Sequence, residues 1–250
     1  MMSSISVLRQ PGKWTEPDFT TPREEIEMTK VVTVKRRALA ANEERAETLR
    51  ARFAASGTLV ANLISSPGSG KTTLLESTVR ALEGKLKTAV IEGDVATEND
   101  SDRIRALGVP AHQILTGGAC HLDARQVAVG IEDGGLPEVD ILFIENVGNL
   151  ICPTTYDLGE DFKVVLLSVA EGDDKPVKYP AIFARAEVAV ITKSDLLPYV
   201  PFDLDSVKSQ IASLNPNGRV LVTSSLKDDG VDGWIDLLRT RLEAKRQSLG

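Results

Sequence analysis

A glycine-rich loop between an apolar strand and a helix limits the folds open to this chain. Residues 65–73 read SSPGSGKTT, directly after the apolar run Leu59–Ser65 and directly before a helical pattern over Leu74–Leu82. Glycines let consecutive backbone N–H groups turn inward around a diphosphate, and the N-terminus of the following helix adds positive dipole. Because a strand–loop–helix unit needs a sheet with helices packed on it, the chain is expected to be an α/β protein.

The loop matches the Walker A pattern for nucleotide phosphates with one departure. Lys71 is expected to reach the β- and γ-phosphates, and Thr72 to supply a hydroxyl to Mg²⁺. The strict pattern has glycine six residues before the lysine, where Ser65 stands in this chain. The predicted phosphate-binding residues are Pro67, Gly68, Ser69, Gly70, Lys71, Thr72 and Thr73.

The chain after Thr58 alternates short β-branched or leucine-rich runs with polar helical stretches. This pattern is typical of a parallel sheet covered by helices on both faces. We predict a three-layer α/β fold of the P-loop NTPase type, with a mostly parallel seven-stranded sheet and an N-terminal helical extension. The predicted strands are Leu59–Ser65, Thr88–Glu92, Ala111–Leu115, Asp140–Glu145, Lys163–Val169, Val188–Ile191 and Val220–Thr223.

The first part of the chain lacks this alternation. Residues 1–34 mix prolines with charges of both signs and show no period of 2 or 3.6, so they are predicted to be a flexible extension. Residues 35–56 carry apolar side chains at helical spacing and are predicted to form one helix. The nucleotide-binding domain is predicted over residues 57–250.

The charge and hydropathy of the chain exclude several classes of partner. Lys plus Arg number 29 and Asp plus Glu 36, a net charge of −7, so no general field draws the chain to nucleic acid or anionic lipid. Apolar runs such as Val164–Leu167 are far shorter than the roughly 18 residues of a membrane span. With no signal-peptide pattern at the start, we expect a soluble cytoplasmic protein that binds neither nucleic acid nor membrane.

Base recognition is expected after two later strands. Residues 192–195 (TKSD) resemble the guanine-reading element of P-loop GTPases, with Thr192 in place of the usual asparagine. Asp195 would accept hydrogen bonds from the guanine N1–H and exocyclic amine, while the Lys193 stem would pack over the ring. A second element after the last strand resembles the loop whose backbone contacts the guanine oxygen. GTP is therefore the expected nucleotide, and the predicted base-binding residues are Lys193, Asp195, Ser224, Ser225 and Leu226.

Two carboxylates are expected beside the phosphates. Asp94 and Glu145 both follow predicted strands, and either is suited to the Mg²⁺ shell or to orienting the attacking water. A helix cap is the alternative for Asp94. No residue stands out as an arginine finger or a water-positioning glutamine, so slow turnover is expected. The predicted catalytic residues are Lys71, Thr72, Asp94 and Glu145, of which the last three are the predicted Mg²⁺ ligands.

Three potential soft-metal ligands also follow predicted strands. Of the two cysteines and two histidines, Cys120, His121 and Cys152 stand in such loops. Thiolate and imidazole suit Zn²⁺ or Ni²⁺ over hard cations. Because a structural zinc site has four ligands, water or Asp123 would complete the set, or two chains would share it. Ordinary structural cysteines are the alternative.

These separated motifs together resemble the HypB family over about Leu59–Leu238. They include EGD at 92–94, GACHLDA at 118–124 and ENVGNLICP at 145–153. The resemblance implies a GTPase that helps to insert nickel into [NiFe]-hydrogenase and forms a nucleotide-dependent homodimer. It implies nickel-handling maturation proteins and the hydrogenase large subunit as partners. The implied Ni²⁺ or Zn²⁺ ligands are Cys120, His121 and Cys152.

The chain departs from some family members, and different functions stay open beside the one that the resemblance implies. Residues 1–34 contain neither Cys nor His, so the nickel storage seen in some members is not expected. A urease nickel-insertion GTPase is a close alternative, but its Cys-Pro-His motif is not found here. The same phosphate loop would also serve a small-molecule kinase that uses ATP and has structural cysteines. It would equally serve a scaffold whose nucleotide-dependent dimerisation matters more than its turnover.

Overall fold

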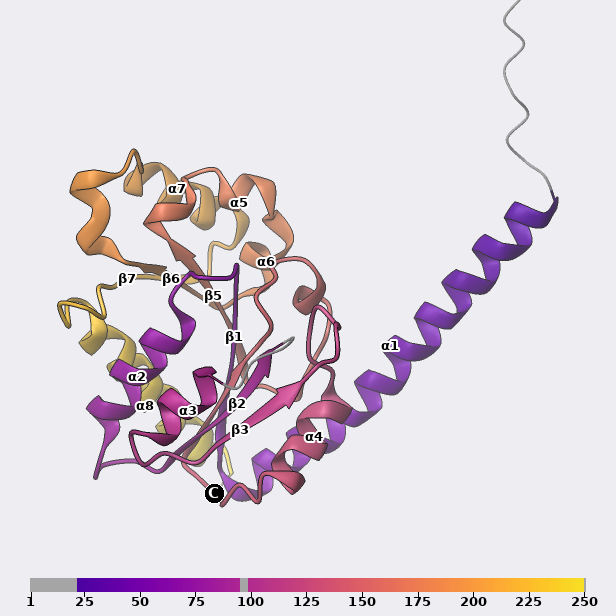
Figure 1. The fold of residues 1–250 in the computed structure, drawn as a ribbon, viewed down its shortest axis with the longest axis horizontal. Helices are drawn as coiled ribbons and strands as arrows, with labels where there is room; N and C mark the ends of the chain where they lie inside the picture. Colours follow the sequence, from indigo (N-terminus) through magenta and orange to yellow (C-terminus); the bar gives the residue numbers. More distant parts are fainter. Residues whose placement is uncertain (1–21, 95–98, 250) are drawn as a thin grey trace, which may run out of the picture. The chain divides into compact units, whose positions relative to one another are not determined.

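A seven-stranded sheet forms the centre of the fold (Figure 1). The computed structural model describes residues 22–94 and 99–249. The strand order is β3-β2-β4-β1-β5-β6-β7, and every neighbouring pair is parallel, which confirms the predicted fold class. The strands are β1 (Leu59–Ser65), β2 (Thr88–Asp94), β3 (Ala111–Leu115), β4 (Ile141–Glu145), β5 (Phe162–Ser168), β6 (Val188–Thr192) and β7 (Arg219–Val222).

Helices cover both faces of this sheet. One face packs on α2, α3 and α8, and the other packs on the C-terminal part of α1 with α4, and further along on α6 and α7. β1 is buried along its whole length because both faces are covered, which explains its nearly continuous apolar sequence. The α-helices are α1 (Pro22–Ser56), α2 (Lys71–Leu82), α3 (Asn99–Arg105), α4 (Ala124–Asp133), α5 (Lys175–Lys178), α6 (Pro180–Arg185), α7 (Leu204–Leu214) and α8 (Val231–Gln247); short 3₁₀ turns are η1 (Cys152–Thr154), η2 (Val169–Glu171) and η3 (Ser194–Tyr199).

The N-terminal helix is longer than predicted. It begins at Pro22 rather than at residue 35, so the predicted flexible extension is corrected over 22–34, while residues 1–21 lie outside the described residues. The sequence explains the earlier start. Proline suits the first turn of a helix, and no glycine or further proline interrupts the run to Ser56. The helix therefore extends beyond the region where apolar periodicity is visible.

The part of α1 from residue 39 onward belongs to the same compact unit as the sheet. Ala46, Leu49 and Phe53 are buried against Val127 and Ile131 of α4. The predicted helical spacing therefore corresponds to a buried stripe, and the compact unit begins before the predicted boundary at residue 57. Across the described ranges, no helix combines the length and apolar character needed to cross a bilayer.

Candidate functional site

The phosphate loop has the backbone geometry that its glycines predicted. It joins β1 to α2, and Gly68 and Gly70 have φ angles of +75° and +94°, which favour glycine. Lys71 is the first residue of α2, and its Nζ donates to Ser65 Oγ at 3.0 Å. The serine that replaces the first glycine of the pattern therefore orients the buried lysine in this state of the protein.

Neighbouring strand ends hold the loop in place. The Thr192 hydroxyl donates to the Ser69 carbonyl at 2.6 Å, and Lys193 Nζ donates to the Gly68 carbonyl at 2.7 Å. On the opposite side, a Cβ added to Gly148 would lie 2.9 Å from Pro67 Cγ, so the segment after β4 packs closely on the loop. Thr192 thus bonds the predicted base-reading element to the phosphate loop.

A cavity of about 410 Å³ lies beside the loop, at the carboxyl ends of β2 and β4. It contains three carboxylates whose ligand oxygens all lie within 4.8 Å of one another: Glu92, Asp100 and Glu145. Glu145 Oε1 accepts from the Thr72 hydroxyl at 3.1 Å and lies 3.8 Å from Lys71 Nζ. Asp94 lines the same cavity outside this cluster. The structure therefore brings the predicted Lys71, Thr72, Asp94 and Glu145 into one cavity.

The pKa values of two of these carboxylates are strongly raised. Burial, and then the charge of Glu145, raises the pKa of Glu92 to about 9, while burial raises the pKa of Glu145 to about 7 despite the charge of Lys71. Among the described residues, Glu92 Oε1 and Glu145 Oε2 are buried oxygens without a hydrogen-bond partner. A bound divalent cation would favour the charged form of both carboxylates and give these oxygens the partner that they lack, so the residues fit Mg²⁺.

Replacing Glu92 with glutamine is expected to stabilise the nucleotide-free protein at pH 8. The folded-state pKa lies above the unfolded value of 4.5, so folding takes up a proton, and stability falls as the pH rises from about 4.5 toward about 9. The neutral amide of glutamine needs no proton uptake, so this loss of stability at high pH is absent from the variant. Each kcal/mol corresponds to about 2–4 °C in Tm for a domain of this size. Thermal unfolding in EDTA should show Glu92→Gln above wild type at pH 8 and close to it at pH 5.

The control for this prediction is Glu243→Gln, which changes an exposed carboxylate on α8. It should leave Tm unchanged at both pH values. A Tm difference between Glu92→Gln and wild type that stayed equal at pH 5 and pH 8 would contradict the proposed origin of the effect.

The predicted base-reading elements lie side by side. Asp195 Oδ1 accepts from the Ser224 hydroxyl at 2.6 Å, and the Ser194 N–H donates to the Thr223 carbonyl at 3.1 Å. Lys193 has a left-handed φ of +59° that places it between the two elements and the phosphate loop. Ser225 is half-buried, whereas the Leu226 side chain is 83% exposed at the tip of its turn.

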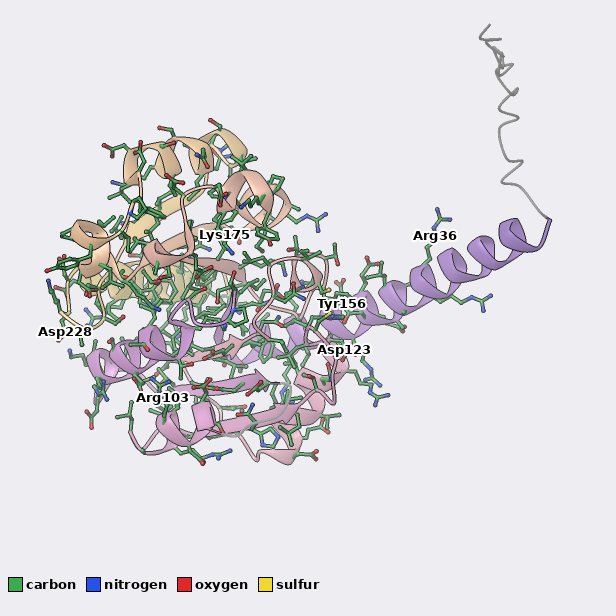
Figure 2. All side chains as sticks on the ribbon, turned by 45° about the horizontal axis from the view of Figure 1, so that its top comes forward. Arg36, Arg103, Asp123, Tyr156, Lys175 and Asp228 are labelled. Carbon is green, nitrogen blue, oxygen red and sulfur yellow. The ribbon has the colours of Figure 1, made fainter. Side chains whose placement is uncertain are left out.

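The three soft ligands meet in a single chain. The ligand atoms of Cys120, His121 and Cys152 all lie within 4.8 Å of one another, and Cys120 Sγ lies 3.6 Å from His121 Nδ1. Both cysteines are free thiols. The His121 ring packs on Tyr156, with 3.8 Å between ring centroids (Tyr156 is labelled in Figure 2). Tyr156 thus fixes the position of the imidazole beside the thiols.

Asp123 has a different role from that of a fourth metal ligand. It is the N-cap of α4, where its carboxylate accepts from the Gln126 N–H at 2.7 Å and the Gln126 side chain bonds back to the Asp123 N–H. Holding the start of α4 in this way positions the Cys120–His121 segment just before it. Within one described chain, the ligand set therefore has three members, and a fourth position is left to water or to another molecule.

Protonation of the metal-binding groups also fits a soft cation. Burial lowers the pKa of His121, which favours the neutral imidazole that binds metals. The hydrogen bond to Cys152, and then burial, raises the pKa of the Cys120 thiol. A bound cation would displace the proton of the Cys120 thiol.

Sequence reasoning missed two carboxylates of the phosphate cavity. Glu92 lies directly opposite Glu145 in the register between β2 and β4, although 53 positions separate them in the chain. Asp100 pairs with Arg103 of the same helix at 3.0 Å. The EGD motif contained Glu92, but only the pairing of β2 with β4 shows that it faces Glu145.

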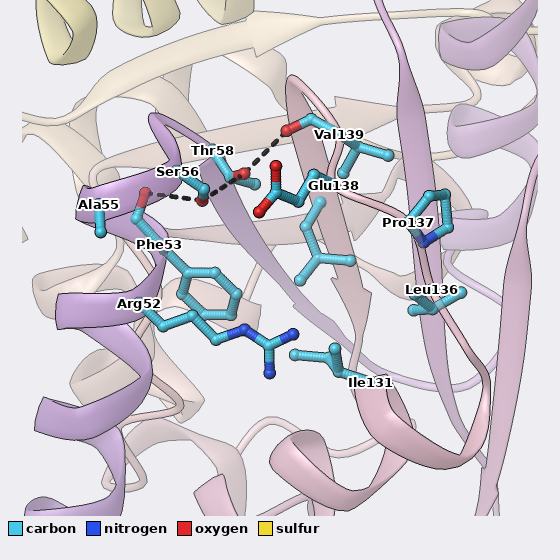
Figure 3. A pocket seen from close by; sticks show the side chains of 11 residues that line it. Arg52, Phe53, Ala55, Ser56, Thr58, Ile131, Leu136, Pro137, Glu138 and Val139 are labelled. Atoms are coloured by element: carbon cyan, nitrogen blue, oxygen red, sulfur yellow. Dashed lines mark hydrogen bonds between the residues drawn. The ribbon is translucent and has the colours of Figure 1, made fainter.

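Two further cavities lie at the opposite, amino-terminal edge of the sheet. The one in Figure 3 has a volume of about 440 Å³ and lies between the end of α1, α4 and the start of β4. Phe53, Ile131 and Leu142 form much of its lining. Because parallel sheets bind ligands at their carboxyl edge, the phosphate cavity and its neighbouring cysteines are the candidate site.

This fold and phosphate site define the chain as a P-loop nucleotide-binding protein. Residues 59–222 match the family model for the CobW/HypB/UreG nucleotide-binding domain. The chain is 50% identical over 200 residues to the hydrogenase maturation factor HypB of Escherichia coli K12, covering 80% of this chain and 69% of that protein. The chain belongs to the HypB family of hydrogenase maturation factors, which confirms the resemblance seen in its motifs.

Two solved structures agree with this assignment. The crystal structure of HypB from Archaeoglobus fulgidus has a TM-score of 0.77 and 39% identity, covering 82% of this chain and all of that one. The structure of HypB from Helicobacter pylori in complex with nickel has a TM-score of 0.76 and 41% identity, covering 84% of this chain and 97% of that one.

Proposed function

We propose that this protein is a GTPase that couples nucleotide binding and hydrolysis to the uptake and release of nickel during [NiFe]-hydrogenase maturation. One observation carries the proposal: Cys120, His121 and Cys152 converge within 4.8 Å on loops that leave the nucleotide-binding edge of the sheet. Sulfur and nitrogen ligands suit Ni²⁺ or Zn²⁺. The nickel complex of the H. pylori relative supports nickel as the cargo.

The phosphate site supports hydrolysis of GTP. The loop N–H groups and Lys71 would hold the phosphates, and the Asp195 carboxylate would accept from the guanine base. Mg²⁺, when bound by Thr72 and the cavity carboxylates, would neutralise charge that develops on the transferred phosphoryl group. Glu145 Oε1 accepts from the Thr72 hydroxyl, while its second oxygen has no partner among the described residues and would be available to the cation or to the attacking water.

The proposed assembly is a homodimer that forms with nucleotide. Three ligands from one chain leave the metal open to a further ligand, and Cys120 is exposed. An open position permits transfer of the cargo by ligand exchange with another protein. The proposed partners are nickel-handling maturation proteins and, directly or through them, the hydrogenase large subunit in the cytoplasm.

Replacing Cys120 with alanine is expected to weaken nickel binding because it removes one of three converging ligands. The free energy lost with a thiolate ligand should lower the affinity for Ni²⁺ by at least about tenfold. Competition with a chromophoric chelator, with GDP and with a non-hydrolysable GTP analogue, measures the effect.

The control is His112→Ala. His112 is the second histidine of the chain and lies in β3, outside the ligand cluster. This variant should bind Ni²⁺ with wild-type affinity and stoichiometry. If Cys120→Ala also bound nickel as wild type does, with both nucleotides, the proposed metal site would be wrong.

A further inference from the structure

Asn146 joins the nucleotide cavity to the metal-binding loop. It directly follows Glu145, it is 1% exposed, and its Oδ1 accepts from the Leu122 N–H at 3.1 Å and from the Val147 N–H at 3.0 Å. Leu122 directly follows the metal ligand His121. One amide oxygen therefore connects the end of β4, where Glu145 lies, to the backbone that carries the imidazole.

Leu122 also rests on the other carboxylate-bearing strand. Its side chain is fully buried over Gly93, where an added Cβ would lie 2.7 Å from Leu122 Cγ. Gly93 stands between Glu92 and Asp94 at the end of β2. The residue after His121 is thus packed directly against both strand ends that line the phosphate cavity, with no intervening layer.

The amide group of Asn146 extends the connection toward the second metal loop. Its Nδ2 donates to Asn62 Oδ1 at 3.2 Å, and Asn62 Nδ2 donates to Glu160 Oε1 at 3.2 Å. Glu160 Oε2 accepts from the Leu158 N–H at 2.6 Å, in the segment that follows Cys152. The side chains of Asn146, Asn62 and Glu160 are all buried. Loss of one hydrogen bond in this series would therefore leave buried polar groups unpaired, which lowers stability.

Bound nucleotide would act on Glu145, the residue directly before Asn146. Glu145 bonds to Thr72 and lies beside Lys71, and both of these partners engage phosphate or cation in the proposed function. Nucleotide binding must therefore rearrange the contacts of Glu145. Asn146 directly follows Glu145 and is closely packed. A shift of Glu145 therefore also moves the Asn146 amide.

We propose that Asn146 is the positioning residue through which the nucleotide state sets the metal affinity of the His121 loop. The proposal rests on the proposed function, since it assigns the link between its two sites to one side chain. Coupling of this kind is a free energy shared by two sites and typically changes affinity about 5- to 150-fold. Without the Asn146 amide, the nucleotide cavity and the metal-binding cluster remain, but the coupling free energy between them is lost.

Asn42 on α1 provides a matched control. Its Oδ1 accepts from the Ala124 N–H at 2.8 Å, and its Nδ2 donates to the Asp157 carbonyl at 2.8 Å. These bonds hold the same two metal loops, but from the helix rather than from the strand ends. Removing Asn42 should weaken nickel binding equally in both nucleotide states, whereas removing Asn146 should abolish the difference between the states.

The test is a set of Ni²⁺ affinities for the full chain in GDP and in a non-hydrolysable GTP analogue. Wild type should show a ratio between the two states of at least about fivefold. Asn146→Ala should reduce that ratio to within about twofold of unity, and Asn42→Ala should weaken both affinities by about tenfold while keeping the wild-type ratio. A wild-type ratio in Asn146→Ala would overturn the proposal.

Two outcomes separate this proposal from the proposed function. If wild type binds Ni²⁺ equally in both nucleotide states, the coupling is wrong while the metal site stands. If wild type and Cys120→Ala bind Ni²⁺ alike, the metal site itself is wrong. Amide hydrogen exchange in metal-free wild type gives a reading that needs no variant. The Leu122 N–H, which bonds to Asn146, should exchange at different rates with the GTP analogue and with GDP, and equal rates would overturn the proposal.

Discussion

Replacing Lys71 with alanine is expected to lower kcat/KM for GTP hydrolysis by about 10²- to 10³-fold, because one preorganised cation at the transferred phosphoryl group contributes that much. The lysine is buried at the first turn of α2, and Ser65 and Glu145 orient its ammonium group toward the cavity. Phosphate release from purified protein, measured with saturating Mg²⁺, gives the rate.

The control is Lys85→Ala, which removes an exposed lysine just beyond the other end of α2. It should leave the rate unchanged. If Lys71→Ala hydrolysed GTP at the wild-type rate, the phosphate loop would not be the catalytic site. If hydrogenase maturation survived in cells with hydrolysis abolished and dimerisation intact, a nucleotide-dependent scaffold would replace the GTPase switch as the function.

Replacing Asp195 with asparagine is expected to weaken GTP binding by about 10²- to 10³-fold, since a site built to accept hydrogen bonds would then present a donor to the guanine N1–H and amine. Xanthosine triphosphate carries a carbonyl in place of the amine, so its affinity should rise in the same variant. Asp195 already bonds to Ser224 of the neighbouring element, which positions its carboxylate in the nucleotide-free structure. Equilibrium titration with fluorescent nucleotides measures both effects.

Asp205→Asn is the matched control, because Asp205 is exposed in the first turn of α7. It should bind both nucleotides as wild type does. An unchanged GTP affinity in Asp195→Asn, together with displacement of GTP by ATP at comparable concentration, would favour an ATP-dependent kinase over the GTPase.

The sequence predicted that Cys120, His121 and Cys152 follow strands at the same edge of the sheet, but not that they come together. All parallel strands end at the same edge of a sheet, so loops after β3 and β4 had to emerge together. Their separation could not be predicted. It depends on the α4 cap at Asp123 and on the ring contact with Tyr156, which are tertiary contacts.

The approach of Glu92 to Glu145 could not be predicted in the same way. β2 and β4 are neighbours only because β4 inserts between β1 and β2, and chain order does not specify that insertion. The start of α1 was missed because of its local sequence, not because of a long-range contact. Residues 22–34 contain many β-branched residues and show no helical apolar period, so neither composition nor periodicity indicated a helix there.

The phosphate loop and the parallel sheet follow from the sequence alone, because they depend on local backbone freedom and residue periodicity. The metal ligands Cys120, His121 and Cys152 stay a prediction from side-chain chemistry. Which carboxylates face each other, and how Asn146 bonds to Leu122, became visible only in the folded chain. The physical reason is that strand pairing and burial join residues far apart in the chain, and a buried amide must find its partners wherever the packed fold places them.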